Sequence, residues 1–515
     1  MELNIGRGIR DDIRRRLPFY WSDWKDAWNY RTIPAVAYMY FANLLPALAF
    51  SFDMFARTND SFGVNEVLLA QVIGCCVYSV LAAQPLVIVG VTGPIAIFAY
   101  TIYDIVTPQG YDYFVLWAWI GIWSFILHAA VAILNACNTL TYVTKLPCDT
   151  FGLYIAFVYL QKAVQILLLQ WEYTESSPAA PYLSIMVALL VMVFGFSSSL
   201  IGSTRLFRPA FRKVIEDYGL PLTVVFFSGF VHIGKMRSVS LEVLPIAGAF
   251  SPTADRSWLI PFWKVDAATV FYALPYAIAV TILFYFDHNV SALMSQGAEF
   301  PLRKPPGFHW DYFLLGGILG LCGILGLPFP NGLIPQGPLH TKALAVYGSD
   351  LDEKGHRTRV IDHIVEQRVS HLSQGLLFLA TMSGPILTAL HQIPQAVLSG
   401  LFIVMGLQTL MANGVVAKLV WISRDRETIS SEDPLLDCRK VAVRLILGLQ
   451  LGAFVACFAV TQTIAAIAFP IIIVLMIPCR IWLLPRLLTN AELEKLDGPV
   501  ASEFVMQSVG GNAKL

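Results

Sequence analysis

Apolar stretches about 20 residues long recur along almost the whole of this sequence. A helix of about that length crosses the hydrocarbon core of a bilayer. The chain is therefore expected to be an all-α polytopic membrane protein. The fourteen predicted spans lie near residues 33–55, 64–83, 86–104, 112–137, 149–170, 180–200, 218–234, 267–294, 310–327, 333–347, 364–390, 394–412, 441–460 and 463–484. An even number of spans places both termini on one side of the membrane.

The scarcity of charge excludes most soluble classes of protein. Only 14% of the residues are charged and 56% are apolar, whereas soluble domains carry about 25% charged residues. This excludes a nucleic-acid binder, a disordered protein and an ordinary cytosolic enzyme. The sequence has no phosphate-binding loop, no nucleophile elbow, no HExxH motif and no CxxC pair among its eight cysteines. We therefore predict no enzyme activity, no cofactor and no metal site.

Lysine and arginine are distributed unevenly over the predicted loops. With both termini inside, the outer loops hold only Arg57, Lys235, Arg237, Arg256 and Lys264. The positive-inside rule then places both termini in the cytosol. The predicted organisation is a cytosolic amphipathic arm (1–32), a first seven-span repeat (33–235), an extracellular linker (236–266), a second seven-span repeat (267–485) and a cytosolic tail (486–515) expected to be disordered.

The third span of each half differs from the other spans. Residues 84–94 read QPLVIVGVTGP and residues 326–338 read GLPFPNGLIPQGP. Each is an extended Pro/Gly-rich piece that ends in Gly-Pro, followed directly by a short helix of about ten residues. Proline fits the first turn of a helix and breaks its interior, so Pro94 and Pro338 are predicted to be the helix breakers. Ten helical residues span only about 15 Å, half the bilayer core. Each short helix is therefore predicted to be a half-helix that begins near the midplane.

One such interruption would usually be structural. Two in corresponding positions indicate the substrate site of a transporter. Because seven is an odd number, the second half is expected to be inverted relative to the first, and the two half-helix N-termini to point at one another. Their free N–H groups and positive dipole ends favour an anion.

Asp287 is the clearest charged side chain inside a predicted span, in the stretch TILFYFDHNVSALM at 281–294. Charges at membrane depth are costly and usually functional. We predict that Asp287 lines the cavity and either contacts the substrate or exchanges a proton. The alternative is a structural polar contact between helices.

Six pieces of the chain follow one another as YFANLLPALAF (40–50), AAQPLVIVGVTGP (82–94), PPGFHWDYFLLGG (305–317), GLPFPNGLIPQGPLHTKAL (326–344), EQRVS (366–370) and IPQAVLSGLFIVMGLQTL (393–410). Together they resemble the anion exchanger and bicarbonate transporter family, over nearly all of residues 18–487. Within that family, FDHNVSALM (286–294) and NGLIPQGPLHTK (331–342) are similar to the borate transporters of fungi and plants.

The resemblance implies two inverted seven-span repeats. Spans 1–4 and 8–11 would form a core domain, and spans 5–7 and 12–14 a gate domain that also makes a homodimer contact. The substrate would lie between the half-helix N-termini and the gate, and transport would occur by an elevator-like movement. The resemblance also makes Asp287 the cavity acid of span eight, and Gly93 and Pro94 the Gly-Pro of span three.

Two positions depart from the animal anion exchangers. Gln336 stands where they carry an arginine, and Thr461 where they carry a lysine. Simple exchange of bicarbonate for chloride is therefore not expected. Tetrahydroxyborate has four hydroxyl groups that donate as well as accept hydrogen bonds. Asp287 can accept from a hydroxyl, and the Gln336 amide can both donate and accept, so this pair suits borate better than bicarbonate.

These arguments predict a secondary active transporter that exports borate. Its candidate substrate-binding residues are Asp287, Gln336, Gly337, Thr92, Gly93, Asn43 and Thr461. One alternative is an exchanger or symporter of another small inorganic anion, chiefly bicarbonate. Another is a non-transporting membrane scaffold. The expected partners are the anion, the lipid bilayer and a second copy of the chain, without nucleic acid. The expected location is the cell membrane, or else a vacuolar or endosomal membrane.

Overall fold

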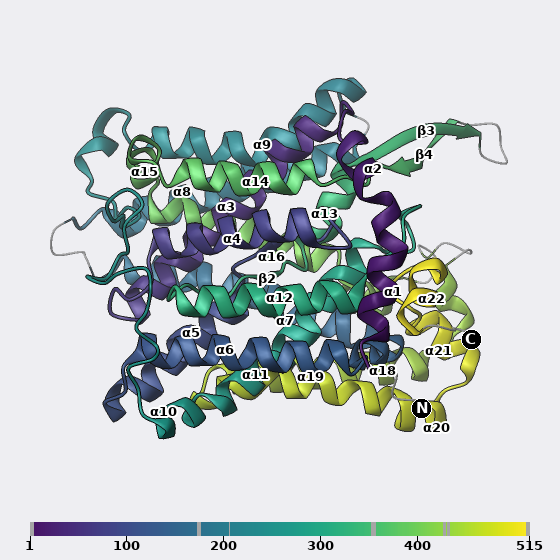
Figure 1. The fold of residues 1–515 in the computed structure, drawn as a ribbon. Helices are drawn as coiled ribbons and strands as arrows, with labels where there is room; N and C mark the ends of the chain where they lie inside the picture. Colours follow the sequence, from purple (N-terminus) through teal and green to yellow (C-terminus); the bar gives the residue numbers. More distant parts are fainter. Residues whose placement is uncertain are drawn as a thin grey trace.

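The computed structural model describes residues 5–172, 177–204, 206–351, 357–425, 429 and 433–510, and it is mostly helical. Long helices lie side by side along one direction (Figure 1). Eight segments are long and apolar enough to cross a membrane. They are α3 (Thr32–Arg57), α4 (Val64–Leu81), α6 (Tyr113–Ile133), α7 (Lys145–Leu169), α8 (Ala180–Ser203), α10 with α11 (Ala267–Tyr272 and Leu274–Ser295), α18 (Lys440–Thr461), and 465–487, which contains α19 (Phe469–Pro478) and α20 (Leu484–Leu487).

Two bent pairs of helices raise this number to ten when each pair is counted as one span. The helices of one pair meet at 84° and those of the other at 67°; the pairs are α14 (Val369–Thr381) with α15 (Gly384–His391), and α16 (Gln395–Met411) with α17 (Gly414–Ser423). The other predicted spans contain shorter or more polar helices, namely α5 (Gly93–Val106), α9 (Pro209–Phe230), α12 (Phe308–Ile324) and α13 (Gln336–Ala343). Every predicted span thus contains a helix, while length and hydropathy support eight to ten crossings.

The helices of the two halves interleave. Helix α4 packs against α14, and α12 packs against α6. Helix α8 packs against α9 and α16, while α18 packs against α19 and α7. Helix α3 contacts α9 and α14, and α11 contacts α19 and α6. The ring of Trp117 on α6 stacks on Phe329 at 4.4 Å, and its indole N–H donates to the Leu327 carbonyl at 2.7 Å. The hydrophobic core is therefore shared between the halves.

The expectation of an all-α fold is wrong in two places. The two extended pieces pair with each other as a buried antiparallel ribbon, β1 (Val89–Gly90) with β2 (Asn331–Gly332). Extended backbone in an apolar interior needs hydrogen-bond partners, and each piece supplies them to the other. A second ribbon, β3 (Ala345–Leu351) with β4 (Arg357–Ile364), projects from one end of the molecule (Figure 1). Its strands carry polar and charged residues that a membrane helix would not tolerate.

The N-terminal arm forms α1 (Arg7–Arg16) and α2 (Tyr20–Lys25). Helix α1 lies across the ends of the long helices (Figure 1). Its junction with α2 is held by the buried carboxylate of Asp23, which accepts from Arg16 at 2.9 Å, from Lys304 at 2.8 Å and from Arg368 at 3.0 Å. Charged donors from three segments satisfy this carboxylate, as burial of a charge requires.

The prediction of a disordered tail is wrong for residues 486–510. They form α21 (Asn490–Leu496) and α22 (Glu503–Gly510), with Leu493, Leu496 and Val505 buried. Asp497 accepts hydrogen bonds from Thr144 at 2.9 Å and from Arg480 at 2.9 Å, and burial raises the pKa of its carboxyl group. The tail folds because its few apolar residues find partners on the end of the helical body; residues 511–515 lie outside the described part of the chain.

Candidate functional site

Asp287 lies in the C-terminal half of α11 and is buried, with 1% of its surface exposed. Its Oδ2 atom accepts a hydrogen bond from Nδ2 of Asn331 at 2.9 Å. Asn331 belongs to β2, and its own Oδ1 accepts from the backbone N–H of Gly332 at 2.8 Å. The carboxylate predicted from the sequence is therefore attached to the ribbon where the two halves meet.

The ribbon also positions the two short helices. Val89 pairs with Gly332 and Gly90 with Asn331, so the strands run in opposite directions. Helix α5 follows β1 and α13 follows β2, each after two or three residues. Both helix N-termini therefore lie beside the ribbon, and the helices leave it in opposite senses. Neither N-terminus has a side-chain cap. The Gly337 N–H donates to the Leu333 carbonyl at 2.9 Å, and the other N–H groups of these first turns remain for a ligand or water.

The predicted short helices differ in detail from expectation. Each was expected to have about ten residues, but α5 has 14 and α13 has 8. Pro94 is the second residue of α5, as expected for a helix start. Pro338 is the third residue of α13, because that helix begins at Gln336 rather than after Gly-Pro. The first turn of a helix tolerates proline at each of these positions, since its N–H groups lack intrahelical partners.

Gln336 bonds to the backbone next to Asn43 where α13 contacts α3. The Gln336 Nε2 atom donates to the carbonyl of Ala42 at 3.4 Å, next to Asn43. Asn43 Oδ1 accepts from Nε2 of Gln71 on α4 at 3.2 Å. Three elements therefore bring primary amides to one buried place.

Several polar atoms of these amides, and the hydroxyl of Thr92 just before α5, are buried without a protein partner. They are Asn43 Nδ2, Gln71 Oε1, Thr92 Oγ1 and Gln336 Oε1. A buried polar atom that lacks a hydrogen bond costs about 1–3 kcal/mol, and such atoms are rare. These unpartnered atoms include both hydrogen-bond donors and hydrogen-bond acceptors. The arrangement therefore fits a small polar ligand, or water, that both donates and accepts.

Glycines let the backbone segments approach closely. A Cβ at Gly90 would lie 2.6 Å from Gln71 Oε1 and 2.9 Å from Asn43 Oδ1. A Cβ at Gly93 would lie 3.0 Å from the Phe50 ring. At Gly337 a Cβ would collide with the Ser295 hydroxyl of α11. The predicted residues Gly93 and Gly337 thus serve close packing of the short helices.

Thr461 lies on α18, a helix that packs against α7 and α19. It ends α18, and its hydroxyl donates to the Phe458 carbonyl at 2.8 Å. Tyr154 of α7 interacts with the Thr461 side chain, and Tyr159 of α7 interacts with the Gln336 side chain. Both phenol groups lie near Asp287. The structure therefore connects Thr461 to the site through a tyrosine rather than placing it beside the carboxylate.

Four residues of this site were not predicted from the sequence, namely Asn331, Gln71, Tyr154 and Tyr159. A signal existed for two of them. Gln71 is a polar residue inside an apolar helix, and Asn331 lies inside the Pro/Gly-rich piece before α13. The tyrosines gave no signal, because an aromatic residue in a membrane helix usually serves packing.

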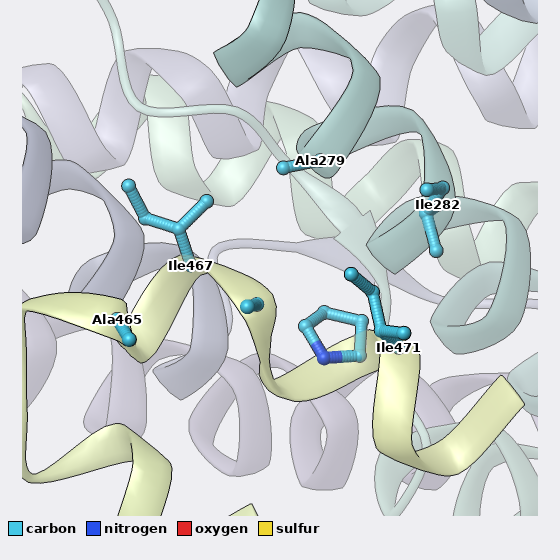
Figure 2. A pocket seen from close by; sticks show the side chains of 7 residues that line it. Ala279, Ile282, Ala465, Ile467 and Ile471 are labelled. Carbon is cyan, nitrogen blue, oxygen red and sulfur yellow. The ribbon is translucent and has the colours of Figure 1, made fainter. Parts of the chain in front are cut away.

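A separate pocket of about 170 Å³ lies between α11 and the segment that leads into α19 (Figure 2). It is lined by Ala279, Ile282, Ala465, Ile467, Ala468, Pro470 and Ile471. These residues offer no side-chain hydrogen bond to an anion. This pocket is therefore distinct in chemistry from the polar site around Asp287.

The buried carboxylate, the amides and the free helix N-termini within an apolar helical body are the features of an integral-membrane transporter rather than an enzyme. The sequence matches the family model of the HCO3- transporter integral membrane domain over residues 4–175 and 167–501. The chain belongs to this family, whose members are membrane transporters of small inorganic anions.

Relatives cover nearly the whole chain. A candidate transporter of Schizosaccharomyces pombe is 51% identical over 96% of this chain and 96% of its own length. Boron transporter 1 of Saccharomyces cerevisiae is 44% identical over 98% of this chain and 87% of its own length. The human Band 3 anion transport protein is 27% identical, over 95% of this chain and 56% of its own. The resemblance to the anion exchanger and bicarbonate transporter family is thereby confirmed.

The fold is also similar to that of a solved structure. The transmembrane domain of the cyanobacterial bicarbonate transporter BicA has a TM-score of 0.55, with 13% identity over 87% of this chain and 98% of that domain. At this identity the similarity concerns the fold alone. The chain therefore has the mostly helical architecture of a membrane transporter.

Proposed function

We propose that this protein is a secondary active transporter that exports borate. The observation that carries the proposal is the buried Asp287 carboxylate beside amides that can both donate and accept. Tetrahydroxyborate presents four hydroxyl groups, each able to donate to Asp287 or to Gln336 Oε1 and to accept from Asn43 Nδ2. The negative charge of borate would be stabilised by the N-termini of α5 and α13. Similarity to Boron transporter 1 supports the same substrate.

The protein is proposed to have fourteen spans in two inverted repeats. When the helices α3 to α9 are matched in order with α11, α12, α13, α14, α16, α18 and α19, several of the main packing contacts have a counterpart. The contact of α4 with α14 corresponds to that of α12 with α6, and α3 with α9 corresponds to α11 with α19. The antiparallel β1–β2 pair lies between the halves. The correspondence between contacts of the first and second halves supports the inverted repeat.

The mechanism is proposed to be alternating access of the elevator type. Helices α3–α6 and α11–α14 would form the moving core, while α7–α9 and α16–α19 would form the gate and the homodimer contact. The polar site lies on core elements and faces gate residues such as Tyr154 and Tyr159. Movement of the core past these tyrosines would carry the anion across the membrane. Both termini are proposed to lie in the cytosol, and the protein in the cell membrane.

Borate flux into liposomes that contain the purified protein tests this proposal. Asp287→Asn and Gln336→Ala should each reduce flux at least tenfold. Asp104→Asn is the control, because this exposed acid forms a surface pair with Arg57 at 3.4 Å, and such pairs contribute little. Absence of borate flux in the unaltered protein, or unchanged flux in Asp287→Asn, would refute the proposal.

Bicarbonate transport is the second candidate, favoured by membership of the HCO3- transporter family. Bicarbonate has one hydroxyl group and would use fewer of the unpartnered atoms around Gln336. A direct comparison of borate and bicarbonate flux in the same vesicles separates the two. Gln336→Arg should lower borate flux and raise bicarbonate flux, because it exchanges an acceptor for a fixed positive charge.

A further inference from the structure

A pocket of about 300 Å³ lies far from Asp287 in the chain, where α17 ends and α18 begins. It combines apolar and basic side chains. Its lining residues are Trp421, Ile422, Arg424, Ile429, Leu436, Cys438, Lys440 and Arg444. None of them belongs to the candidate transport site, so the pocket requires a separate explanation.

Three exposed basic residues of this pocket lack a carboxylate partner. No ion pair joins Arg424, Lys440 or Arg444 to any acid in the described part of the chain. Lys440 and Arg444 lie one turn apart on the same face of α18, and like charges at this spacing destabilise a helix. An anion bound between them would remove that repulsion.

Neighbouring basic residues behave differently. Arg439 holds Glu492 through two contacts of 2.7 and 2.8 Å, and this arginine lowers the pKa of the Glu492 carboxyl group. Lys495 contacts Asp437 at 2.6 Å. Arg439 and Lys495 are therefore each paired with an acid, whereas none of the ion pairs between described residues includes Arg424, Lys440 or Arg444.

Trp421 provides an independent sign of a ligand. It is 92% buried, it lines the pocket, and its indole Nε1–H has no acceptor. Five other tryptophans donate this hydrogen to a backbone carbonyl, namely Trp117, Trp119, Trp123, Trp258 and Trp310. A buried donor without an acceptor is unfavourable. The indole of Trp421 is therefore available to an acceptor atom inside the pocket.

The position of the pocket indicates which anion would enter it. Lys440 is the first residue of a membrane-spanning helix, so the basic residues lie at the level where lipid headgroups begin. Ile422, Ile429 and Leu436 add an apolar wall. Basic pockets at the ends of transmembrane helices bind anionic lipid headgroups. A free inorganic anion would make no use of the apolar wall.

We propose that this pocket binds an anionic phospholipid of the adjoining leaflet. The phosphate would contact Arg424, Lys440 and Arg444 and accept the indole hydrogen of Trp421. The upper part of the acyl chains would lie along Ile422 and Leu436. Arginine and lysine suit phosphate oxygens well. The proposal holds whichever anion the protein transports, because the two sites share no residue.

Thermal unfolding of the full-length protein in detergent tests the proposal with three probes. They are dioctanoyl phosphatidylinositol 4-phosphate, dioctanoyl phosphatidylcholine and inorganic phosphate at equal concentrations. The anionic lipid should raise the unfolding midpoint in a saturable manner, and the other two should not, because only it combines a headgroup of net negative charge with acyl chains. An equal shift with inorganic phosphate, or with phosphatidylcholine, would overturn the proposal.

Variants then assign the effect to the pocket. Arg424→Gln, Lys440→Gln and Arg444→Gln together should weaken the lipid about a hundredfold, since each basic residue near a membrane surface contributes about fivefold. Trp421→Phe removes the donor but keeps the ring and should weaken the lipid about tenfold. The matched control neutralises the exposed Arg7, Arg10 and Arg14 of α1. The assignment to this pocket would be contradicted if the lipid still raised the unfolding midpoint in the triple variant. It would also be contradicted if the control variant lost that rise equally.

Discussion

The two short helices beside the β1–β2 ribbon each follow one of its strands, and they differ in chemistry. Helix α5 has 14 residues and its first ten are all buried. Helix α13 has 8 residues and carries Gln336, His340 and Lys342. The long helices behind them differ likewise, since α3 contributes the neutral Asn43 and α11 the acidic Asp287. The comparison teaches that similar backbone arrangements lie on both sides of the ribbon, while the carboxylate bonded to the ribbon comes from the second half.

Moving the carboxylate across the ribbon tests this asymmetry most strongly. We expect Asp287→Asn to reduce anion flux about ten- to a hundredfold, because a hydrogen bond to a charged group contributes about 1.5–3 kcal/mol. Adding Asn43→Asp should not restore flux, since the donor Nδ2 of Asn331 lies beside Asp287. Flux in reconstituted vesicles measures both variants. Recovery in the double variant would show that the halves are interchangeable.

The second comparison concerns the amide donors of the two halves. Asn331 donates to the Asp287 carboxylate at 2.9 Å, whereas Gln71 donates to the Asn43 amide at 3.2 Å. We expect Asn331→Ala to destabilise the protein by about 1.5–3 kcal/mol and Gln71→Ala by about 0.5–1.5 kcal/mol, because bonds to charged acceptors are stronger. Unfolding midpoints in one detergent provide the measurement. Equal losses of stability in the two variants would argue against a charged acceptor at Asp287.

The glycines at the two helix starts should also differ. Gly337→Ala forces a methyl group against the Ser295 hydroxyl, while Gly93→Ala meets only the edge of Phe50 at 3.0 Å. We expect a loss of about 1–3 kcal/mol at position 337, typical of overpacking, and a smaller loss at position 93. Unfolding midpoints again report the effect. Adding Ser295→Ala should restore most of the stability to Gly337→Ala, and failure to do so would place the strain elsewhere.

The smallest effect is expected at Thr92, which precedes α5. Its hydroxyl is buried without a partner, so Thr92→Val should change stability by less than about 0.5 kcal/mol or raise it slightly. Anion flux should fall a few-fold if the hydroxyl contacts the anion. A large loss of stability would reveal a structural bond to Thr92 and weaken the view that the first half supplies ligand contacts.

Much of this architecture could be predicted from the sequence. Hydropathy located a helix in each predicted span, and the cost of charge in a membrane singled out Asp287. The Pro/Gly-rich pieces marked the two short helices because proline restricts where a helix begins. The pairing of Val89 with Gly332 could not be predicted, since a two-residue strand has no detectable period and its partner lies in the other half.

The β3–β4 hairpin and the helices of the tail are indicated in the sequence only by weak patterns, and stronger patterns favour other structures there. The first three residues of the strand 345–351 continue an apolar run and fall inside the span predicted at 333–347, although the polar partner strand 357–364 favours a hairpin. The tail was expected to be disordered because it is polar, yet Thr489 and Glu492 form a capping box, a local helix signal. The roles of Asn331 and Gln71 depend on partners distant in sequence, which composition does not reveal.

The β1–β2 ribbon also constrains how the protein is made. Residues 89–90 emerge from the ribosome long before residues 331–332, so the first extended piece has no strand partner while the first half enters the membrane. Its backbone groups must stay hydrated or borrow other partners until the second half arrives. The ribbon therefore closes late in biosynthesis. Truncation before residue 331 should yield a chain that inserts its early helices and yet exposes its first half to quality-control proteases.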